Sequence, residues 1–209
     1  MGISINENAL TEYTANNRLK HAALIWLLVV LPAGLIECLD LLQLVDFRFQ
    51  RALILNGEWW RLVTGHLDHL GWVHFGLNAL FLAFVLMIFE PLQRVVFTLG
   101  LWLFSVISIS VCLLFFSPEL IWYVGLSSSL YSLLVIGILL DVRFSLFVRV
   151  GAVALVFIKV WFEQGDQLPW VSQIISGPVA EVSHLYGVAT GFVLVSIIFC
   201  MSRFGVNKI

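Results

Sequence analysis

Six long runs of hydrophobic residues, separated by more polar segments of varied length, make up most of the sequence. A helix needs about 20 apolar residues to cross the hydrocarbon core of a bilayer, so runs of this kind predict membrane-spanning helices. We expect these helices over residues 21–39, 72–89, 95–116, 126–140, 145–161 and 184–201. The pattern therefore predicts an all-α membrane protein, built as a bundle of six transmembrane helices.

Neither an internal repeat nor a flexible linker divides the chain, so we expect one domain. A short polar tail over residues 1–20 precedes a six-helix domain over residues 21–203, and a short tail over residues 204–209 follows it. The first tail mixes both signs of charge and is unlike a cleavable signal peptide. We therefore expect the first apolar run to stay in the protein as a membrane anchor.

The connection between the first two predicted helices, residues 40–71, is long. It carries Trp59 and Trp60 among charged residues. Tryptophan is enriched where the membrane meets water, and a segment that mixes aromatic and charged residues suits this interface. The sequence predicts a long first loop lying on the membrane surface, and an ordinary loop with tryptophan anchors fits the same pattern.

The composition strengthens the membrane assignment. Hydrophobic residues make up 61% of the chain and charged residues 11%, and the mean hydropathy is +1.01. Soluble domains carry about 25% charged residues. No basic patch is present that would suit nucleic acid, so the lipid bilayer is the expected surrounding.

The placement of lysine and arginine predicts the orientation, because cytoplasmic connections carry an excess of both. With the N-terminus in the cytoplasm, the inner side holds Arg18, Lys20, Arg94, Arg143, Arg149, Arg203 and Lys208. The outer side then holds Arg48, Arg51 and Arg61, with Lys159 near an outer helix end. This excess predicts that both termini are cytoplasmic. It also places the starts of the fourth and sixth helices at similar depth on the outer side.

A small polar cluster opens the fourth apolar run, with the sequence Gly125-Leu126-Ser127-Ser128-Ser129-Leu130-Tyr131. A serine hydroxyl is a weak nucleophile until a base takes its proton. Ser127 is expected near a helix N-terminus, where Gly125 permits a tight turn and backbone N–H groups can bind an anion. Serines also mediate helix packing in membranes, which is the alternative interpretation of this cluster.

A candidate base opens the sixth run, where His184 is followed by Gly187 and Gly191. The two glycines form a GxxxG face that lets another helix approach closely. His184 lies on roughly the same face, which would carry its imidazole toward the partner helix. We expect Ser127 and His184 to meet as nucleophile and base. The alternative is a packing motif with a histidine at the water interface.

A second polar constellation runs from Trp60-Arg61 through His66 and His69 to His74 and Asn78. His74 and Asn78 are four residues apart and share a helix face. Neutral histidine and asparagine both donate N–H groups, and two such donors beside a nucleophile suit an oxyanion hole. A metal site of His66, His69 and His74 is one alternative, although no HExxH pattern is present. A polar helix junction that satisfies its own hydrogen bonds is the other.

Taken together, these motifs resemble the rhomboid intramembrane serine proteases. The segment before and within helix two is similar to the family's at Trp60, Arg61, His69, His74 and Asn78, and Glu90 stands where the family has an acidic residue. The nucleophile motif is similar at Gly125, Ser127 and Tyr131, and the HxxGxxxG of helix six matches His184, Gly187 and Gly191. The resemblance implies a serine endopeptidase that cleaves within the membrane and needs no cofactor.

The resemblance also implies a mechanism. Ser127 would attack a peptide carbonyl, and His184 would take the hydroxyl proton and return it to the leaving amine. His74, Asn78 and the Ser127 backbone N–H would hold the oxyanion. We expect no acidic residue to orient His184, so the site is predicted to be a dyad with Tyr131 holding the imidazole ring.

One position departs from the family pattern, because Ser128 stands where rhomboids usually have glycine after the nucleophile. The extra side chain is expected to narrow the pocket or to form a hydrogen bond of its own. With the small size and short tails, this motif resembles the rhombosortase branch. That branch implies a bacterial inner membrane, a site open to the periplasm, and exported substrates anchored by glycine-rich C-terminal membrane tails.

Two rival functions come from other classes. A small transporter or channel would use His66, His69, His74 and His184 as a proton or metal path, but the inverted repeats typical of transporters are not found in the sequence. A catalytically inactive rhomboid-like protein would bind membrane helices without cutting them. The presence of both Ser127 and His184 argues against this second rival.

Overall fold

A computed structural model describes residues 7–42, 45–165, 177 and 180–204. Lys208 and all but one residue of the expected C-terminal tail lie outside these residues. The described elements are α1 (Glu7–Leu41), β1 (Phe49–Gln50), α2 (Arg51–Leu55), α3 (Arg61–Leu67), α4 (Trp72–Ile88), the 3-10 helix η1 (Glu90–Leu92), α5 (Val95–Phe116), β2 (Trp122–Tyr123), α6 (Ser127–Leu140), α7 (Leu146–Glu163) and α9 (Glu181–Arg203). The described part of the protein is therefore mainly helical, as the apolar runs predict.

Each of the six apolar runs forms a helix, in the order α1, α4, α5, α6, α7 and α9. The largest difference is at the start of α1, which begins at Glu7 rather than near residue 21. Residues 7–20 contain no glycine or proline, so nothing in the predicted tail interrupts the helix. This tail is helical in its described part rather than extended.

Fewer helices meet the criteria for a membrane span than the sequence predicts. Among the described residues, three helical segments are long and apolar enough to cross a bilayer: Asn16–Asp40, Val95–Phe116 and Glu181–Arg203. The pair α3 and α4, bent by 93°, adds a fourth if it counts as one span. The helix α6 is apolar but short. The number of six spans therefore stays a prediction.

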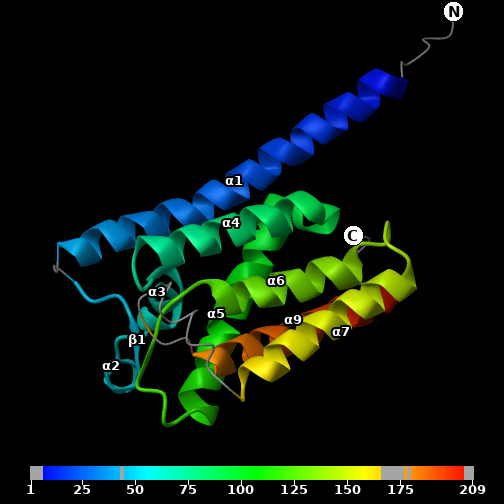
Figure 1. The fold of residues 1–209 in the computed structure, drawn as a ribbon. Helices are drawn as coiled ribbons and strands as arrows, with labels where there is room; N and C mark the ends of the chain where they lie inside the picture. Colours follow the sequence, from blue (N-terminus) through cyan, green and yellow to red (C-terminus); the bar gives the residue numbers. More distant parts are fainter. Residues whose placement is uncertain (1–6, 43–44, 166–176, 178–179, 205–209) are drawn as a thin grey trace, which may run out of the picture.

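The helix α6 lies at the centre of the bundle. Ten of its 14 residues are buried, as expected for a helix that is hydrophobic on all sides. It packs most extensively against α9 and also contacts α4, α5 and α7. Figure 1 shows α1 running alongside α4 on one side of α6, with α7 and α9 on the other. The helix that begins with Ser127 is thus held by its neighbours on every side.

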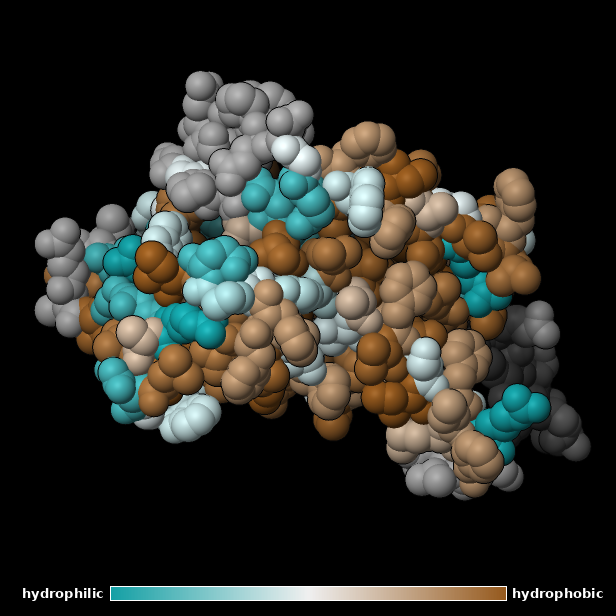
Figure 2. All heavy atoms as spheres, turned by 90° about the horizontal axis from the view of Figure 1, so that it is seen from below, coloured by the Kyte–Doolittle hydropathy of each residue, from teal (hydrophilic) through white to brown (hydrophobic). Residues whose placement is uncertain are grey.

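The outer surface is strongly apolar. Val96 and Phe147 are each 87% exposed, which would be costly in water but suits contact with lipid. Figure 2 shows hydrophobic side chains over most of one face, with hydrophilic residues gathered toward the end that holds β1 and α2 in Figure 1. A smaller hydrophilic group lies at the opposite end. An apolar belt between two polar ends is the surface expected of a membrane protein.

A cluster of charged residues joins α1, η1 and the segment after α6 at the end of the bundle opposite Ser127. Glu90 pairs with Arg18 of α1 and with Arg143 after α6, the latter at 2.9 Å. Arg143 also pairs with Asp141, and its hydrogen bonds lower the pKa of this carboxyl below the ordinary value. The sequence predicts that Arg18, Glu90 and Arg143 share the inner side, and the structure places the three together.

The segment between α1 and α4 is a folded unit rather than a plain loop. Its strand β1 pairs antiparallel with β2, so that Phe49 lies opposite Tyr123. The helix α3 packs against β1, where a Cβ atom on Gly65 would lie only 2.5 Å from the Phe49 nitrogen. The N–H of Gly125 donates to the Gly65 carbonyl at 3.0 Å. These contacts join the unit to the turn that precedes Ser127.

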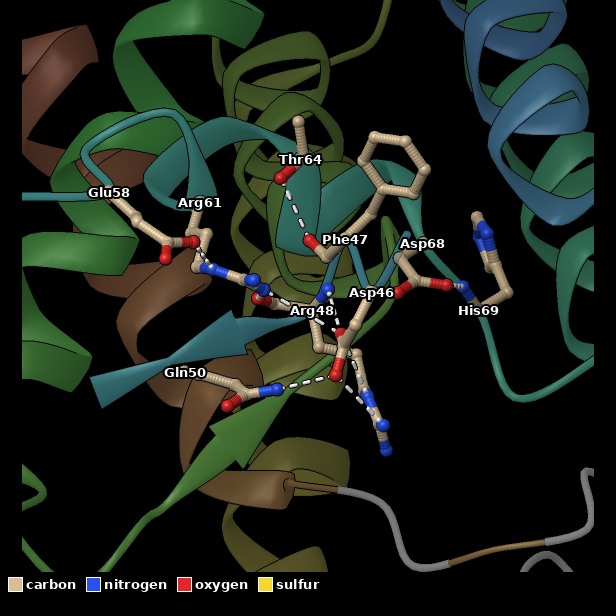
Figure 3. A network of polar contacts seen from close by, with 9 residues as sticks. All are labelled: Asp46, Phe47, Arg48, Gln50, Glu58, Arg61, Thr64, Asp68 and His69. Atoms are coloured by element: carbon tan, nitrogen blue, oxygen red, sulfur yellow. Dashed lines mark hydrogen bonds and ion pairs between the residues drawn. The ribbon is translucent and has the colours of Figure 1, made fainter. Parts of the chain in front are cut away.

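Arg61 is the centre of a hydrogen-bond network that holds this unit in shape (Figure 3). The buried guanidinium donates from Nε to Glu58 at 2.7 Å and from Nη1 to the Arg48 carbonyl at 2.7 Å, and it lies over the Trp60 ring. Partial burial opposes ionisation of Asp46, but the hydrogen bonds and charge of Arg48, together with Arg61, keep the pKa of Asp46 below its ordinary value. The Trp60-Arg61 motif therefore stabilises the connection.

Candidate active site

The structure brings Ser127 and His184 together. Ser127 is the first residue of α6, and His184 lies in the first turn of α9. The Ser127 Oγ atom lies 2.8 Å from His184 Nε2, within hydrogen-bond distance. His184 is only 5% exposed, whereas Ser127 is half-buried and so remains reachable. A hydroxyl and an imidazole that are 57 residues apart in sequence thus lie within hydrogen-bond distance of each other.

The second ring nitrogen of His184 contacts a carboxylate that the sequence analysis did not assign to the site. Glu163, the last residue of α7, places Oε2 3.2 Å from His184 Nδ1. An ionised carboxylate only accepts hydrogen bonds, so Nδ1 carries the proton and Nε2 presents its lone pair to the Ser127 hydroxyl. The expectation that no acidic residue orients His184 is therefore wrong for the structure.

Glu163 is held from its other side by Lys159, one helical turn earlier. Lys159 Nζ lies 2.5 Å from Glu163 Oε1. The same ammonium donates a hydrogen bond to the Tyr131 hydroxyl. The Tyr131 ring lies beside the imidazole of His184, with centroids 4.8 Å apart and planes 49° apart. Tyr131 thus packs on the imidazole ring, while Glu163 bonds to its edge.

Three glycines let the backbones approach closely enough to form this pair. Gly125 has a φ of +121°, and a Cβ atom there would lie 2.7 Å from the His74 ring. A Cβ atom on Gly187 would lie 2.1 Å from the Ser128 carbonyl oxygen, and one on Gly191 would lie 2.9 Å from the Ser132 carbonyl oxygen. The face formed by Gly187 and Gly191 therefore lies directly against α6, as its GxxxG spacing predicts.

Two side chains of α4, His74 and Asn78, carry N–H donors, and the ring of His74 lies against the turn before Ser127. The N–H of Leu70 donates to His74 Nδ1 at 3.3 Å, which leaves the proton of a neutral ring on Nε2. This Nε2 faces the turn before Ser127, since a Cβ atom on Gly125 would lie 3.1 Å from it. Asn78 donates one amide N–H to the His74 carbonyl at 3.0 Å and has a second to offer. Both side chains are buried.

The N-terminus of α6 provides further donors. The first four N–H groups of a helix have no acceptor within it, and the helix dipole favours negative charge at this end. Ser127 is the first residue of the helix, so its own N–H belongs to this group. Together with His74, whose Nε2 faces the turn before Ser127, this helix end offers N–H groups to an anion beside Ser127.

The side chain of Ser128 points into the protein core. Its side chain is fully buried, and its Oγ lies 2.7 Å from the Tyr123 hydroxyl and 3.3 Å from His66 Nδ1. His66 continues this network to Ser110, at 3.0 Å. A serine at this position is expected either to narrow the pocket or to form a hydrogen bond of its own. The structure contains the hydrogen bond.

His69, another histidine of the segment from Trp60 to Asn78, packs against His74. The His69 ring is buried and meets the His74 ring edge to face, with centroids 5.1 Å apart. His66 instead bonds to the serines of α5 and α6. Within the described residues, no group of three or more histidine, cysteine, aspartate or glutamate side chains is placed to hold a metal ion.

Comparison with known proteins identifies the family. A scan against protein-family models matches the Rhomboid domain over residues 56–201, which is more than half of the chain. Neither the curated proteins nor the solved structures give a match. The matched region includes the Trp60-Arg61 motif, Ser127 and His184. The chain therefore belongs to the rhomboid family.

Proposed function

We propose that this protein is an intramembrane serine endopeptidase with Ser127 as nucleophile and His184 as general base. Rhomboid proteins are generally serine proteases that act within membranes. The observation that carries the proposal for this chain is the 2.8 Å contact between Ser127 Oγ and His184 Nε2, with the histidine buried and the serine only half-buried.

The reaction proceeds in two stages. Ser127 Oγ attacks the carbonyl carbon of the scissile peptide bond as its proton passes to His184 Nε2. The tetrahedral intermediate collapses, the C–N bond breaks, and His184 gives the proton to the leaving amine. A water molecule then attacks the resulting ester with His184 again as base, which releases the new carboxyl terminus and restores the Ser127 hydroxyl.

The negative charge on the carbonyl oxygen requires N–H donors beside Ser127. We assign this role to His74 Nε2–H and the second amide N–H of Asn78, both from α4, and to the backbone N–H of Ser127 at the start of α6. Removing one such donor from an oxyanion hole costs about 3–4 kcal/mol of transition-state stabilisation. Their burial strengthens each interaction, because the local dielectric is low.

The substrates are membrane-anchored proteins with C-terminal transmembrane tails. A substrate helix must unwind locally to expose a peptide bond, because a helical carbonyl is already hydrogen-bonded. Glycine near the cut lowers this cost, since it is a poor helix former. The Ser127-Ser128 sequence favours the rhombosortase branch and its glycine-rich tails.

The proposed orientation follows from the distribution of charge. Both termini are cytoplasmic, and the protein lies in the inner membrane of a bacterium with the pocket open to the periplasm. The pairing of Glu90 with Arg18 and Arg143 at the end of the bundle opposite Ser127 supports this arrangement, because inner connections are rich in basic residues.

The reaction class is tested with a serine-directed fluorophosphonate probe on the purified protein in detergent. The wild type is expected to be labelled, because His184 activates the Ser127 hydroxyl. His184→Gln is expected to lose labelling, since glutamine cannot act as a base. A wild-type protein that is folded but unlabelled would favour the inactive helix-binding rhomboid. Equal labelling of the His184→Gln variant would exclude His184 as the base.

The substrate class is tested in cells that lack this protein. Exported proteins with glycine-rich C-terminal membrane tails are expected to retain their tails, and mass spectrometry of the membrane fraction would detect the uncut peptides. Restoring the wild-type chain should restore cleavage. Normal processing of every such protein in its absence would exclude this substrate class while leaving the hydrolytic mechanism intact.

A further inference from the structure

We infer that Glu163 is a positioning residue that completes a Ser127–His184–Glu163 triad. This inference rests on the proposed function, because it assigns Glu163 a task only if His184 is the base. The geometry that carries it is a continuous line of contacts from α6 through α9 to α7, with Oγ to Nε2 at 2.8 Å and Nδ1 to Oε2 at 3.2 Å.

The two oxygens of Glu163 have separate partners. Oε2 faces His184 and Oε1 faces Lys159. The side chain of Glu163 is 19% exposed and that of His184 is 7% exposed, so the contact between them lies away from bulk water. A carboxylate whose two oxygens each bind a partner has little freedom to rotate. It therefore fixes the plane of the imidazole as well as its tautomer.

The chemical role of Glu163 is to support the charged form of His184. When His184 Nε2 takes the Ser127 proton, the ring becomes an imidazolium, and an adjacent negative charge stabilises it. Glu163 stays ionised throughout and takes no proton. The proton that leaves Ser127 goes to His184 and then to the leaving amine, so the balance of the reaction is unchanged.

Other groups that face His184 also change how stable its imidazolium form is. Tyr131 of α6 covers the ring, His74 of α4 interacts with it electrostatically, and Lys159 of α7 places a positive charge on the far side of Glu163. The positive charge of Lys159 opposes the imidazolium, whereas the carboxylate of Glu163 favours it. The two side chains thus act on His184 with opposite sign.

The opposite effects of Lys159 and Glu163 on His184 distinguish a positioning role of Glu163 from a purely structural one. An ion pair between Lys159 and Glu163, one turn apart on α7, would stabilise the helix slightly whether or not His184 were present. Loss of either partner would then have the same effect. A triad predicts unequal effects on the reaction rate and opposite effects on its pH dependence.

The test compares Glu163→Gln with Lys159→Met by the rate constant of fluorophosphonate labelling and by peptide-bond cleavage across pH. Glu163→Gln is expected to lower kcat about 100-fold with little change in KM. This is less than the roughly 10⁴-fold loss for a triad whose carboxylate is fully buried. The acid limb of its pH profile should move to lower pH, because the imidazolium loses its counter-charge.

Lys159→Met is expected to lower kcat less than about 10-fold, since the carboxylate remains, and to move the acid limb to higher pH. Glu119→Gln, which changes an exposed carboxylate in the turn after α5, serves as the matched control and should behave as wild type. A labelling rate constant does not depend on the fraction of folded protein, so partial misfolding of a variant does not obscure the comparison.

Two results would overturn the inference. One is a Glu163→Gln variant with the rate and pH profile of the wild type. The other is a pair of variants, Glu163→Gln and Lys159→Met, with equal losses and unmoved acid limbs. Either would leave Ser127 and His184 as a dyad, provided that the wild type is labelled. A wild type without labelling would instead contradict the proposed function.

Discussion

Replacing Ser127 by alanine is expected to abolish peptide-bond cleavage and leave the fold intact. In the proposed mechanism the Ser127 hydroxyl oxygen forms the ester intermediate, so the variant has no group that can replace it. In serine proteases the loss of the nucleophile lowers kcat by about 10⁶-fold. Cleavage is measured with a membrane-tailed substrate protein in proteoliposomes, with products resolved by mass spectrometry. The variant should give no product above the uncatalysed background.

Ser196→Ala is the matched control for this variant. Ser196 is exposed on α9 and bonds only to the backbone carbonyl of Phe192 among the contacts of the described residues, so its loss should leave cleavage unchanged. Thermal unfolding in detergent should give the same midpoint for the wild type and both variants within about 2 °C, because a surface or half-buried serine contributes little stability. Cleavage by Ser127→Ala at the wild-type rate would refute its role as nucleophile.

The second large effect is expected from Gly187→Ala. A Cβ atom at this position would lie 2.1 Å from the Ser128 carbonyl oxygen, and the clash is with backbone rather than with a flexible side chain. The helices α6 and α9 must therefore separate. Overpacking of this kind costs about 1–3 kcal/mol of folding free energy. The same movement pulls His184 away from Ser127, so cleavage should fall about 100-fold or more, as expected when catalytic groups are misplaced by about 1 Å.

Gly100→Ala provides the comparison for this substitution. Gly100 lies within α5, and a Cβ atom there would meet nothing within 4 Å. Since alanine favours the helix over glycine by about 0.5–1 kcal/mol, this variant should be as stable as the wild type or more so. Thermal unfolding and the cleavage rate are measured for both. Equal stability and activity of Gly187→Ala and the wild type would contradict the close contact between α6 and α9.

The helices could be predicted from the sequence because the signal for each one is local. A run of about 20 apolar residues has few other structures open to it in a membrane, since every backbone N–H and carbonyl must find a partner. The bounds of α5, for example, match the predicted run at both ends. The segment between α1 and α4 was less predictable. The pairing of Phe49 with Tyr123 joins residues 74 positions apart, and no local pattern specifies such a contact.

The meeting of Ser127 and His184 could be anticipated because both open helices on the same side of the bundle. Glu163 could not be placed in the same way, because the sequence predicts which end of a helix a residue occupies but not the rotation of that helix. One signal was available. Lys159 lies inside an apolar run and Glu163 follows it one turn later, and charged residues in such a run usually mark a functional site.

The contact between Gly187 and Ser128 restricts the number of residues between His184 and Gly187 in α9. His184 and Gly187 are three positions apart, so they share a helix face only while that count is kept. One inserted residue between them would turn the imidazole by about 100° around the helix axis and shift it by about 1.5 Å along it. The interval from His184 to Gly187 must therefore keep its length if the imidazole is to reach Ser127 while Gly187 lies against Ser128.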